Sequence, residues 1–450
     1  MVLAVLTLAV IGGEWHGHPA FGAVSAVLAA VALAMLVPHG GRTGRAFAVV
    51  VLVLSLAVVL TGPGWHGVAE ALRKSAFIAA FFAALTSLRH AADTSPAIAR
   101  CGRFLAEQPP GRRYVALTAG GHVFALLLNY GAIALLGGLA LASARAEPDA
   151  GVRAHRTRRM LLAIQRGFVA SLPWSPLAFA MAVSTAMVPG ATWAGAVLPC
   201  TVSSAILMLA GWALDRRFKP RPTGPRPAST RPEGDWRLVL PLPGLLAILI
   251  VSVGTLHLLT GIRAVGVVIL VVPALSLCWW ALQGGARPFA HAARRGAEYV
   301  TRNLPRYRGE TLVLMMAGLI GTLGGQLLAP LAAAGGVDPA ALPGWAVLLG
   351  LLWGIPLLGQ IGANPILAVT LLAPILPPPA ALGLAPSDYI LAMTSGWALS
   401  GATSPYTATT LLTASFGGVS ARHVGLVWNG GFALTAGVLL SGWVLIAAAP

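Results

Sequence analysis

The chain has 450 residues, of which 57% are hydrophobic and only 10% charged, and its mean hydropathy is +0.80. A soluble protein of this length interleaves far more charge, so the composition excludes that class and predicts a polytopic membrane protein. The formal net charge of +17 does not indicate nucleic-acid binding, because the basic residues lie in short loops between apolar runs.

Apolar runs long enough to form membrane helices follow one another along the whole chain. They predict an all-α fold of about eleven transmembrane helices plus two re-entrant hairpins, with a short N-terminal span in residues 1–19. Residues 95–110 and 286–305 are basic and amphipathic, which is typical of helices that lie at a membrane surface. Residues 215–236 are rich in Pro and Arg and are expected to form an extended cytoplasmic linker.

The distribution of Lys and Arg favours hairpins at two of the apolar runs. If 111–144 and 344–376 fold back without crossing and the N-terminus is cytoplasmic, 27 of the 30 basic residues lie on the cytoplasmic side. The other side keeps Arg73, Lys74 and Arg263. If 111–144 crossed instead, the arginines before it and after it would lie on opposite faces, against the positive-inside rule.

These assignments divide the chain into two matching halves. Residues 20–214 and 237–450 each hold three spans, a hairpin and two further spans, and an odd number of crossings inserts the second half upside down. Such an inverted repeat is typical of secondary transporters, which bind their substrate near the membrane midplane between the repeats. The C-terminus is then expected outside.

Three dipeptides interrupt long apolar runs: Ser175-Pro176, Asn364-Pro365 and Ser404-Pro405. Ser and Asn are favoured N-caps and Pro is favoured at the first helical position, so each dipeptide predicts a helix that begins within the membrane. A helix start exposes free N–H groups and the positive end of the helix dipole, which hydrocarbon does not satisfy. We therefore expect these helix starts to face a cavity enclosed by protein.

Candidate ligands of a substrate or ion lie at the hairpin tips and in the interrupted spans. Asn supplies a carbonyl acceptor and an amide donor, and Gly lets the backbone turn tightly or approach a ligand. Hydroxyl groups gathered at a Gly-Pro break are explained less well by the packing of small residues between helices. The predicted binding residues are Asn129, Tyr130, Gly131, Ser175, Gln360, Asn364, Thr403, Ser404 and Thr407, with Na⁺ as a candidate ligand of the hairpin tips.

Catalytic chemistry is not expected, because the 13 acidic residues lie mostly in loops or near span ends and form no catalytic cluster. Glu310 follows Arg308 and is expected to be its exposed neighbour. His122 in the first hairpin is a candidate proton carrier, because His titrates near neutral pH; a hydrogen-bonded structural role is the alternative. The pair of His16 and His18 lacks a carboxylate or thiol partner for a metal.

Two hairpins with Asn near the tip, each followed by a span broken at a hydroxyl residue and Pro, resemble the ion transporter superfamily. Within it the chain is most similar to the divalent anion/sodium symporters, which have Ser-Asn-Thr at both tips and Thr-Pro-Pro-Asn in both broken spans. Asn129 and Asn364 match the tip Asn, and Thr403-Ser404-Pro405-Tyr406 is similar to the second motif. The resemblance implies carboxylate and sodium sites between the tips and the broken spans, and a transport domain that moves like an elevator within a dimer.

The sequence therefore predicts a secondary active transporter, and not an enzyme, of a small organic anion with one or two carboxylates, coupled to Na⁺ or H⁺. The alternatives are an ion antiporter without an organic substrate and a membrane subunit of a larger permease. The expected partners are the lipid bilayer, a small anionic solute and a second copy in a homodimer, with no nucleic acid and no cofactor besides Na⁺. A composition rich in Ala, Gly, Pro and Arg indicates a GC-rich bacterium and hence its inner membrane.

Overall fold

The structure, a computed structural model, describes residues 1–93, 95–218, 234–334 and 341–449, which form helices and connecting turns without a strand. The predicted all-α membrane fold is confirmed: among the described residues, seven helical segments are long and apolar enough to cross a membrane. Several other predicted crossings fall on helices that are shorter, interrupted or more charged, so the number of crossings stays a prediction. Most of the predicted linker lies outside the described residues.

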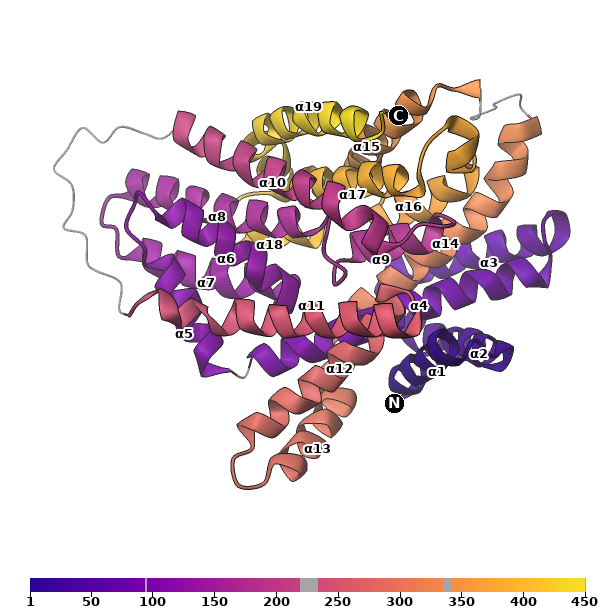
Figure 1. Ribbon diagram of the computed structural model, residues 1–450, viewed down its shortest axis with the longest axis horizontal. Coiled ribbons are helices and arrows are strands. Elements are labelled where there is room, and N and C mark those ends of the chain that lie inside the picture. The colour runs from indigo at the N-terminus through magenta and orange to yellow at the C-terminus, as the bar shows by residue number, and fades with distance from the viewer. Residues whose placement is uncertain (94, 219–233, 335–340, 450) are drawn as a thin grey trace.

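The first half of the chain runs from the N-terminal helices to a long helix that ends at the linker (Figure 1). Its longest helix, α4, lies in the core, and its residues 75–88 are buried on every side. The helices of this half are α1 (Val2–His16), α2 (Pro19–Leu36), α3 (Gly41–Thr61), α4 (Trp65–Asp93), α5 (Pro96–Ala106), α6 (Arg113–Leu128), α7 (Gly131–Arg145), α8 (Ala150–Ser171), α9 (Phe179–Met187) and α10 (Trp193–Arg217).

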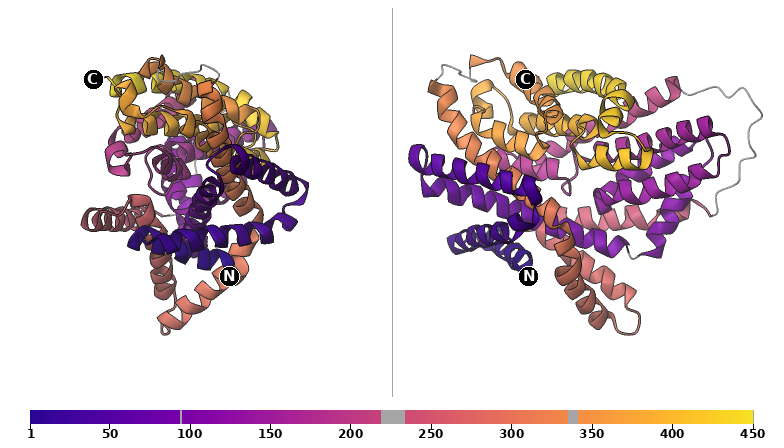
Figure 2. Two further views of the ribbon diagram at one scale, coloured as in Figure 1. Left: turned by 90° about the vertical axis from the view of Figure 1, so that its right-hand side faces the viewer. Right: turned by 180° about the vertical axis from the view of Figure 1, so that it is seen from behind.

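In the second half a hairpin again precedes an interrupted span, but the short helix α13 precedes the long helix α14, whereas α5 of the first half follows the long helix α4. Helices α12 and α13 project from the rest of the molecule (Figures 1 and 2). Its core helix is α17, whose residues 388–403 are all buried. The helices of this half are α11 (Pro241–Thr260), α12 (Ala264–Gln283), α13 (Pro288–Glu298), α14 (Arg308–Ala334), α15 (Gly344–Gln360), α16 (Pro365–Leu372), α17 (Pro386–Thr403), α18 (Ala408–Gly417) and α19 (Gly430–Ala447), with π-helical turns at Tyr299–Asn303 and His423–Trp428.

The helix start predicted at Asn364-Pro365 is confirmed. Asn364 is the N-cap of α16 and Pro365 is its first residue. The Oδ1 of Asn364 accepts a hydrogen bond from the backbone N–H of Ile366 at 2.9 Å. This side chain therefore satisfies one of the free donors at the helix start, as N-cap residues do.

The helix starts predicted at the two Ser-Pro dipeptides are wrong by three residues. The spans are interrupted where expected, but α9 begins at Phe179 and α18 at Ala408. The Oγ atoms of Ser175 and Ser404 each accept a hydrogen bond from the backbone N–H two residues later, at 3.1 and 3.3 Å. A hydroxyl that closes such a turn delays the helix, which explains the common offset.

Corresponding pairs of helices pack together within each half. The first helix of each hairpin lies against the first part of an interrupted span: α6 against α8, and α15 against α17. The short second parts cross between the halves, α9 contacting α16 and α17, and α18 contacting α7 and α8. An inverted repeat predicts this exchange, although the repeat itself stays a prediction.

Glycines bring the backbones of these helix pairs into contact. A Cβ on Gly167 of α8 would lie 2.2 Å from the carbonyl oxygen of Thr118 in α6. A Cβ on Gly396 of α17 would lie 2.7 Å from the carbonyl oxygen of Leu352 in α15. Close packing through small residues is typical of membrane helices, since they gain little from apolar burial in lipid. It fixes each hairpin to its interrupted span.

Candidate functional site

A cavity of about 470 Å³ lies where the hairpin tips, the interrupted spans and α4 meet. Its wall includes Asn129 and Tyr130 from the first tip, Asn364 from the second tip, and Ser175 and Thr407 from the two breaks. These residues lie far apart in the sequence, and each was predicted as a ligand. The structure therefore gathers most of the predicted binding residues around one space, while their role as ligands stays a prediction.

Among the described residues, four helices that follow a hairpin tip or a break begin at this cavity. The wall contains the cap residue of α7 and the first residues of α9, α16 and α18. The N–H groups in a first turn have no acceptor within their own helix, and each helix start carries roughly half a positive charge. Several helix starts around one space make it favourable for an anion.

Asn129 has an unusual backbone conformation at the first tip. Its φ of 49° and ψ of −131° make it the one non-glycine residue with positive φ among those the structure describes. This conformation strains any residue with a Cβ, and a strained residue in a cavity wall is often functional. Gly would adopt the same turn without strain. The presence of Asn at this position therefore indicates that its side chain has a role.

Arg89 of α4 belongs to the cavity wall, although the sequence analysis did not name it as a site residue. Its guanidinium lies over the ring of Tyr307 at 5.4 Å and approaches the Asp93 carboxylate only loosely, at 3.8 Å. The Nε atom is buried and donates no hydrogen bond within the described part of the chain. Arg89 therefore offers a positive charge to an anion in the cavity.

The sequence indicated that Arg89 is a functional candidate, but counting the basic residues by side of the membrane did not identify it. Arg89 lies inside the apolar run 68–92, where an ionisable residue is a functional candidate by default. Counting it among the 27 cytoplasmic basic residues treated it as part of a loop. In the structure it lies within the helix Trp65–Asp93, one turn before its end.

Glu310 is exposed, as expected, and it also lines the cavity, which the sequence analysis did not predict. It lies in the first turn of α14, and the positive charge of Arg89 acts on it. The wall thus carries one basic and one acidic side chain, together with the helix starts. Glu310 was missed because its position beside an arginine at a span end resembles an interface.

Gly131 does not line the cavity, but it determines where Arg89 lies. A Cβ on Gly131 would be 2.8 Å from Nε of Arg89 and 3.2 Å from its Cδ. Any larger residue would therefore push the guanidinium away from α7. Gly131 acts by leaving space for the Arg89 side chain.

Three more predicted residues lie behind the wall rather than in it. The Oγ of Ser404 donates to the carbonyl oxygen of Gly359 at 2.7 Å, which attaches the break in α17 to the end of α15. The Oγ1 of Thr403 donates to the carbonyl oxygen of Leu399 at 2.8 Å. The amide of Gln360 donates back into its own helix, at 3.5 Å. These residues hold the break and the second tip in place.

His122 lies outside the cavity wall and is partly buried. Its Nε2 accepts a hydrogen bond from the indole N–H of Trp174 at 3.3 Å, and the rings stack with centroids 5.8 Å apart. This contact attaches α6 to the break between α8 and α9. The predicted role as a proton carrier remains untested, whereas the structural contact is evident.

A buried polar network supports the break in α17 from the other side. The amide nitrogen of Asn429 donates to the carbonyl oxygen of Ala402 at 3.2 Å and to Oε1 of Gln165 at 3.0 Å. Nε of Arg166 donates to Oδ1 of Asn429 at 3.2 Å. The last carbonyls of a helix lack partners within it, so these side chains from α8 and the C-terminal region satisfy them.

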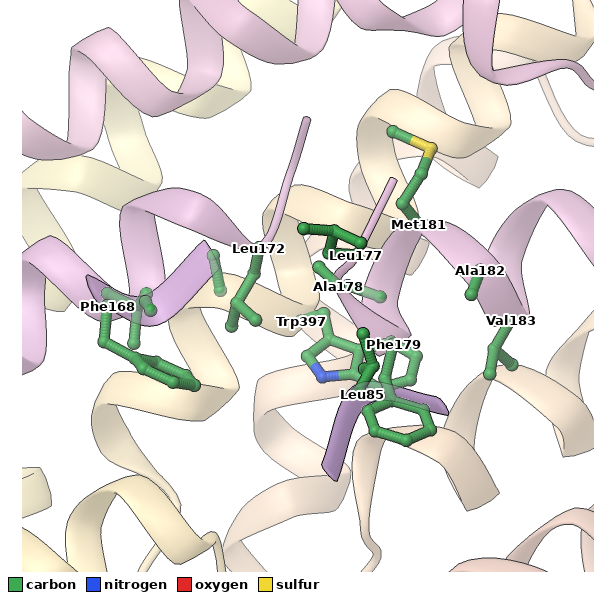
Figure 3. Packing of buried hydrophobic residues seen from close by; sticks show 14 of the residues in the cluster. Leu85, Phe168, Leu172, Leu177, Ala178, Phe179, Met181, Ala182, Val183 and Trp397 are labelled. Atoms are coloured by element: carbon green, nitrogen blue, oxygen red, sulfur yellow. The ribbon is translucent and has the colours of Figure 1, made fainter. Parts of the chain in front are cut away.

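Aromatic and aliphatic side chains form the remainder of the cavity wall. The rings of Tyr130 and Phe168 stack with centroids 5.4 Å apart. Figure 3 shows two of the wall residues, Phe179 at the start of α9 and Trp397 of α17, close to the buried core residue Leu85 of α4. The arrangement suits a ligand that has an apolar body and an anionic group.

The chain matches no family model and no curated protein. The solved structure of MtrF from Neisseria gonorrhoeae, one of a class of antimetabolite efflux pumps, is similar over 87% of this chain and 85% of its own, with a TM-score of 0.53 and 15% identity. The two chains share a fold. The YdaH transporter of Alcanivorax borkumensis matches 94% of this chain and 98% of its own, with a TM-score of 0.48 and 14% identity. Identities this low extend the likeness to the fold alone.

Proposed function

We propose that the protein is a secondary active transporter of a small organic anion with one or two carboxylates. The observation that carries this proposal is the cavity of about 470 Å³ on which Arg89 and the starts of four helices converge. Transporters use the N-termini of interrupted helices to hold anionic groups near the membrane midplane. The volume lies within the range of about 300–1,000 Å³ that is common for small-molecule sites.

The charges around the cavity suit an anion of low charge. Four helix starts of roughly half a positive charge each and the guanidinium of Arg89 are opposed by the carboxylate of Glu310 and by the ends of α6, α8 and α17, which carry roughly half a negative charge each. The balance stays slightly positive, which favours an anion of low charge. Asn129 and Asn364 add amide groups at the tips that accept or donate hydrogen bonds.

Coupling to H⁺ or Na⁺ is assigned to the same region. Glu310 is a carboxylate beside the proposed anion site, and a carboxylate suits a cation that accompanies the substrate. The inverted repeat, the elevator-like movement and a homodimer in a bacterial inner membrane belong to this proposal, and the paired packing of the two halves supports the repeat.

Glu310 also favours a second candidate function. An ion antiporter commonly uses a carboxylate in its ion pathway, and the wall of the cavity contains Glu310. The antiporter predicts ion exchange that requires Glu310 and no organic anion. The transporter of organic anions predicts dependence on both Arg89 and a carboxylate substrate.

Reconstitution into proteoliposomes tests the proposal. Labelled succinate and acetate are supplied with and without gradients of Na⁺ and of pH, in both directions because MtrF is an efflux pump. We expect saturable uptake of at least one probe and its loss in the double variant Asn129→Ala, Asn364→Ala. Replacement of two hydroxyl residues outside the cavity, Thr201→Ala with Ser415→Ala, is the matched control.

Two outcomes would contradict this assignment. Saturable uptake that survives the double Asn variant would show that the site lies elsewhere. Cation exchange that is lost in Glu310→Gln but needs no carboxylate would establish the antiporter instead.

A further inference from the structure

A second pocket of about 480 Å³ lies between α1, α2, α4 and α9. Its wall contains three basic residues, Arg73, Lys74 and Arg263, and two acidic residues, Glu14 and Glu70. The three basic residues are those that the charge distribution leaves on the face opposite the other 27. The few basic residues expected on that face therefore lie together in this pocket, although they are distant in sequence.

The charges in this pocket do not cancel. Arg263 forms a bidentate ion pair with Glu14, in which Nε and Oε2 are 2.6 Å apart. Lys74 pairs with Glu70 at 2.8 Å between Nζ and Oε1. Arg73 is exposed and forms no ion pair with any residue that the structure describes. One guanidinium therefore remains available to an anion.

Close approaches to glycines position these charged side chains. The Cδ of Arg73 lies 3.3 Å from where a Cβ on Gly22 of α2 would be, so its stem runs over that helix. The Oε2 of Glu14 lies 2.7 Å from where a Cβ on Gly266 of α12 would be. The Arg263 guanidinium covers the ring of Phe77 at 4.8 Å. The pocket is thus built by packing rather than by free surface side chains.

The pocket adjoins the central cavity. Helix α9 is about 13 Å long, and Phe179 at its start lines the cavity while Met187 at its end lines the pocket. Aromatic rings form the barrier between them: the centroid of Phe81 is 5.1 Å from that of Phe179 and 6.3 Å from that of Phe77. Phe77 lines the pocket, so the barrier is only a few side chains thick.

We propose that this pocket is an anion-binding antechamber of the transport route, in which Arg73 holds a carboxylate on one side of the aromatic barrier. The inference rests on the proposed function, since an antechamber presupposes a central site. The inference adds a second anion site, in which the side chain of Arg73 binds the anion. The paired charges around Arg73 keep the pocket only weakly positive, so an anion is held briefly and released.

Thiol reagents of opposite charge test the antechamber without requiring transport. The exposed Cys278 is replaced by Ser, Met187→Cys places a thiol in the wall, and the protein is reconstituted in phosphatidylcholine vesicles, so that no anionic headgroup competes. The rates of an anionic and a cationic methanethiosulfonate are compared. We expect Arg73→Gln to lower the ratio of anionic to cationic rate severalfold, since loss of a nearby positive charge slows the anionic reagent and speeds the cationic one.

Matched variants separate the charge of Arg73 from other effects. Arg73→Lys keeps the charge and is expected to keep the ratio. The double variant Glu70→Gln, Lys74→Gln removes a neutral ion pair from the same wall and is expected to leave the ratio unchanged. A ratio that is the same in Arg73→Gln as in the parent protein would overturn the proposal.

Protection by succinate distinguishes this site from the central one. We expect succinate to slow modification of the thiol at position 187 in the parent and in Arg89→Gln, but not in Arg73→Gln. Protection that is lost in Arg89→Gln and retained in Arg73→Gln would refute the antechamber. If charge preference and protection persist while no carboxylate is transported, the proposed function fails and the anion site stands.

Discussion

Replacement of Arg89 by Gln is expected to weaken carboxylate binding. The guanidinium lies in the cavity wall, its Nε donates no hydrogen bond within the described residues, and its nearest carboxylate oxygen, on Asp93, is 3.8 Å away. A bound carboxylate would therefore gain a charge-assisted hydrogen bond without breaking a strong one. Gln keeps a donor of similar length and removes the charge.

The expected magnitude follows from the partial burial of the side chain, which is 24% exposed. Hydrogen bonds to charged groups contribute about 1.5–3 kcal/mol, and the middle of that range, about 2 kcal/mol, suits a site still open to water. Because 1.4 kcal/mol is a factor of ten, we expect Kd to rise about thirtyfold. Arg89→Lys should recover part of this loss, since it retains the charge but not the planar donors.

Gly131→Ala provides an independent test of the same geometry. The added Cβ would lie 2.8 Å from Nε of Arg89, so the guanidinium must move. We expect weaker binding in this variant and almost no additional loss when Arg89→Gln is combined with it, because both changes remove one interaction. Titration calorimetry in detergent with succinate measures each Kd, and Arg100→Gln on the surface of α5 is the control.

The reasoning would be refuted by either of two results. The first is a Kd in Arg89→Gln within about twofold of the parent value, since that corresponds to less than about 0.5 kcal/mol. The second is additive loss in the double variant, which would show that Gly131 acts through something other than Arg89.

Three further predictions concern the fold around the site. Asn129→Gly should raise the melting temperature, because it relieves strain of about 1 kcal/mol or more, while it weakens succinate binding; a fall in melting temperature would contradict the strained backbone. Asn364→Ala should lower the free energy of unfolding by about 1 kcal/mol, as measured by denaturant titration, because α16 loses its N-cap, whereas Asn364→Ser should retain most of it. Gly167→Val should destabilise the protein more than Gly138→Val on thermal melting, because only the first forces α6 away from α8.

The sequence predicted the parts of the fold that depend on local chemistry. The breaks at Ser175, Asn364 and Ser404 follow from N-cap and proline preferences, and the interruption at Asn129 follows from polar residues in an apolar run. The exact starts of α9 and α18 were not predictable by the same rule. A Ser hydroxyl can cap a helix or close a turn, and the packing around it decides between the two.

The sequence predicted the hairpin tips and helix breaks that line the candidate site, but it did not predict the two charged residues in the wall. Arg89 and Glu310 lie near the ends of helices, where sequence alone does not distinguish a side chain in a cavity from one at an interface. Gln360 and Ser404 have suitable chemistry, yet their side chains bond to neighbouring backbone. The direction in which a side chain points depends on the rotation of its helix about its own axis. Tertiary packing determines that rotation, so the sequence alone does not predict it.

The central claim is that the chain doubles back at 111–144 without crossing the membrane, so that helix starts face one anion site. The most direct measurement is the sidedness of single cysteines at Gly111 and Ala146, exposed positions that flank α6 and α7, in the Cys278→Ser background. An impermeant maleimide applied to oriented vesicles should label both positions from the same side. Labelling from opposite sides would contradict the re-entrant hairpin and, with it, the anion site and the transporter.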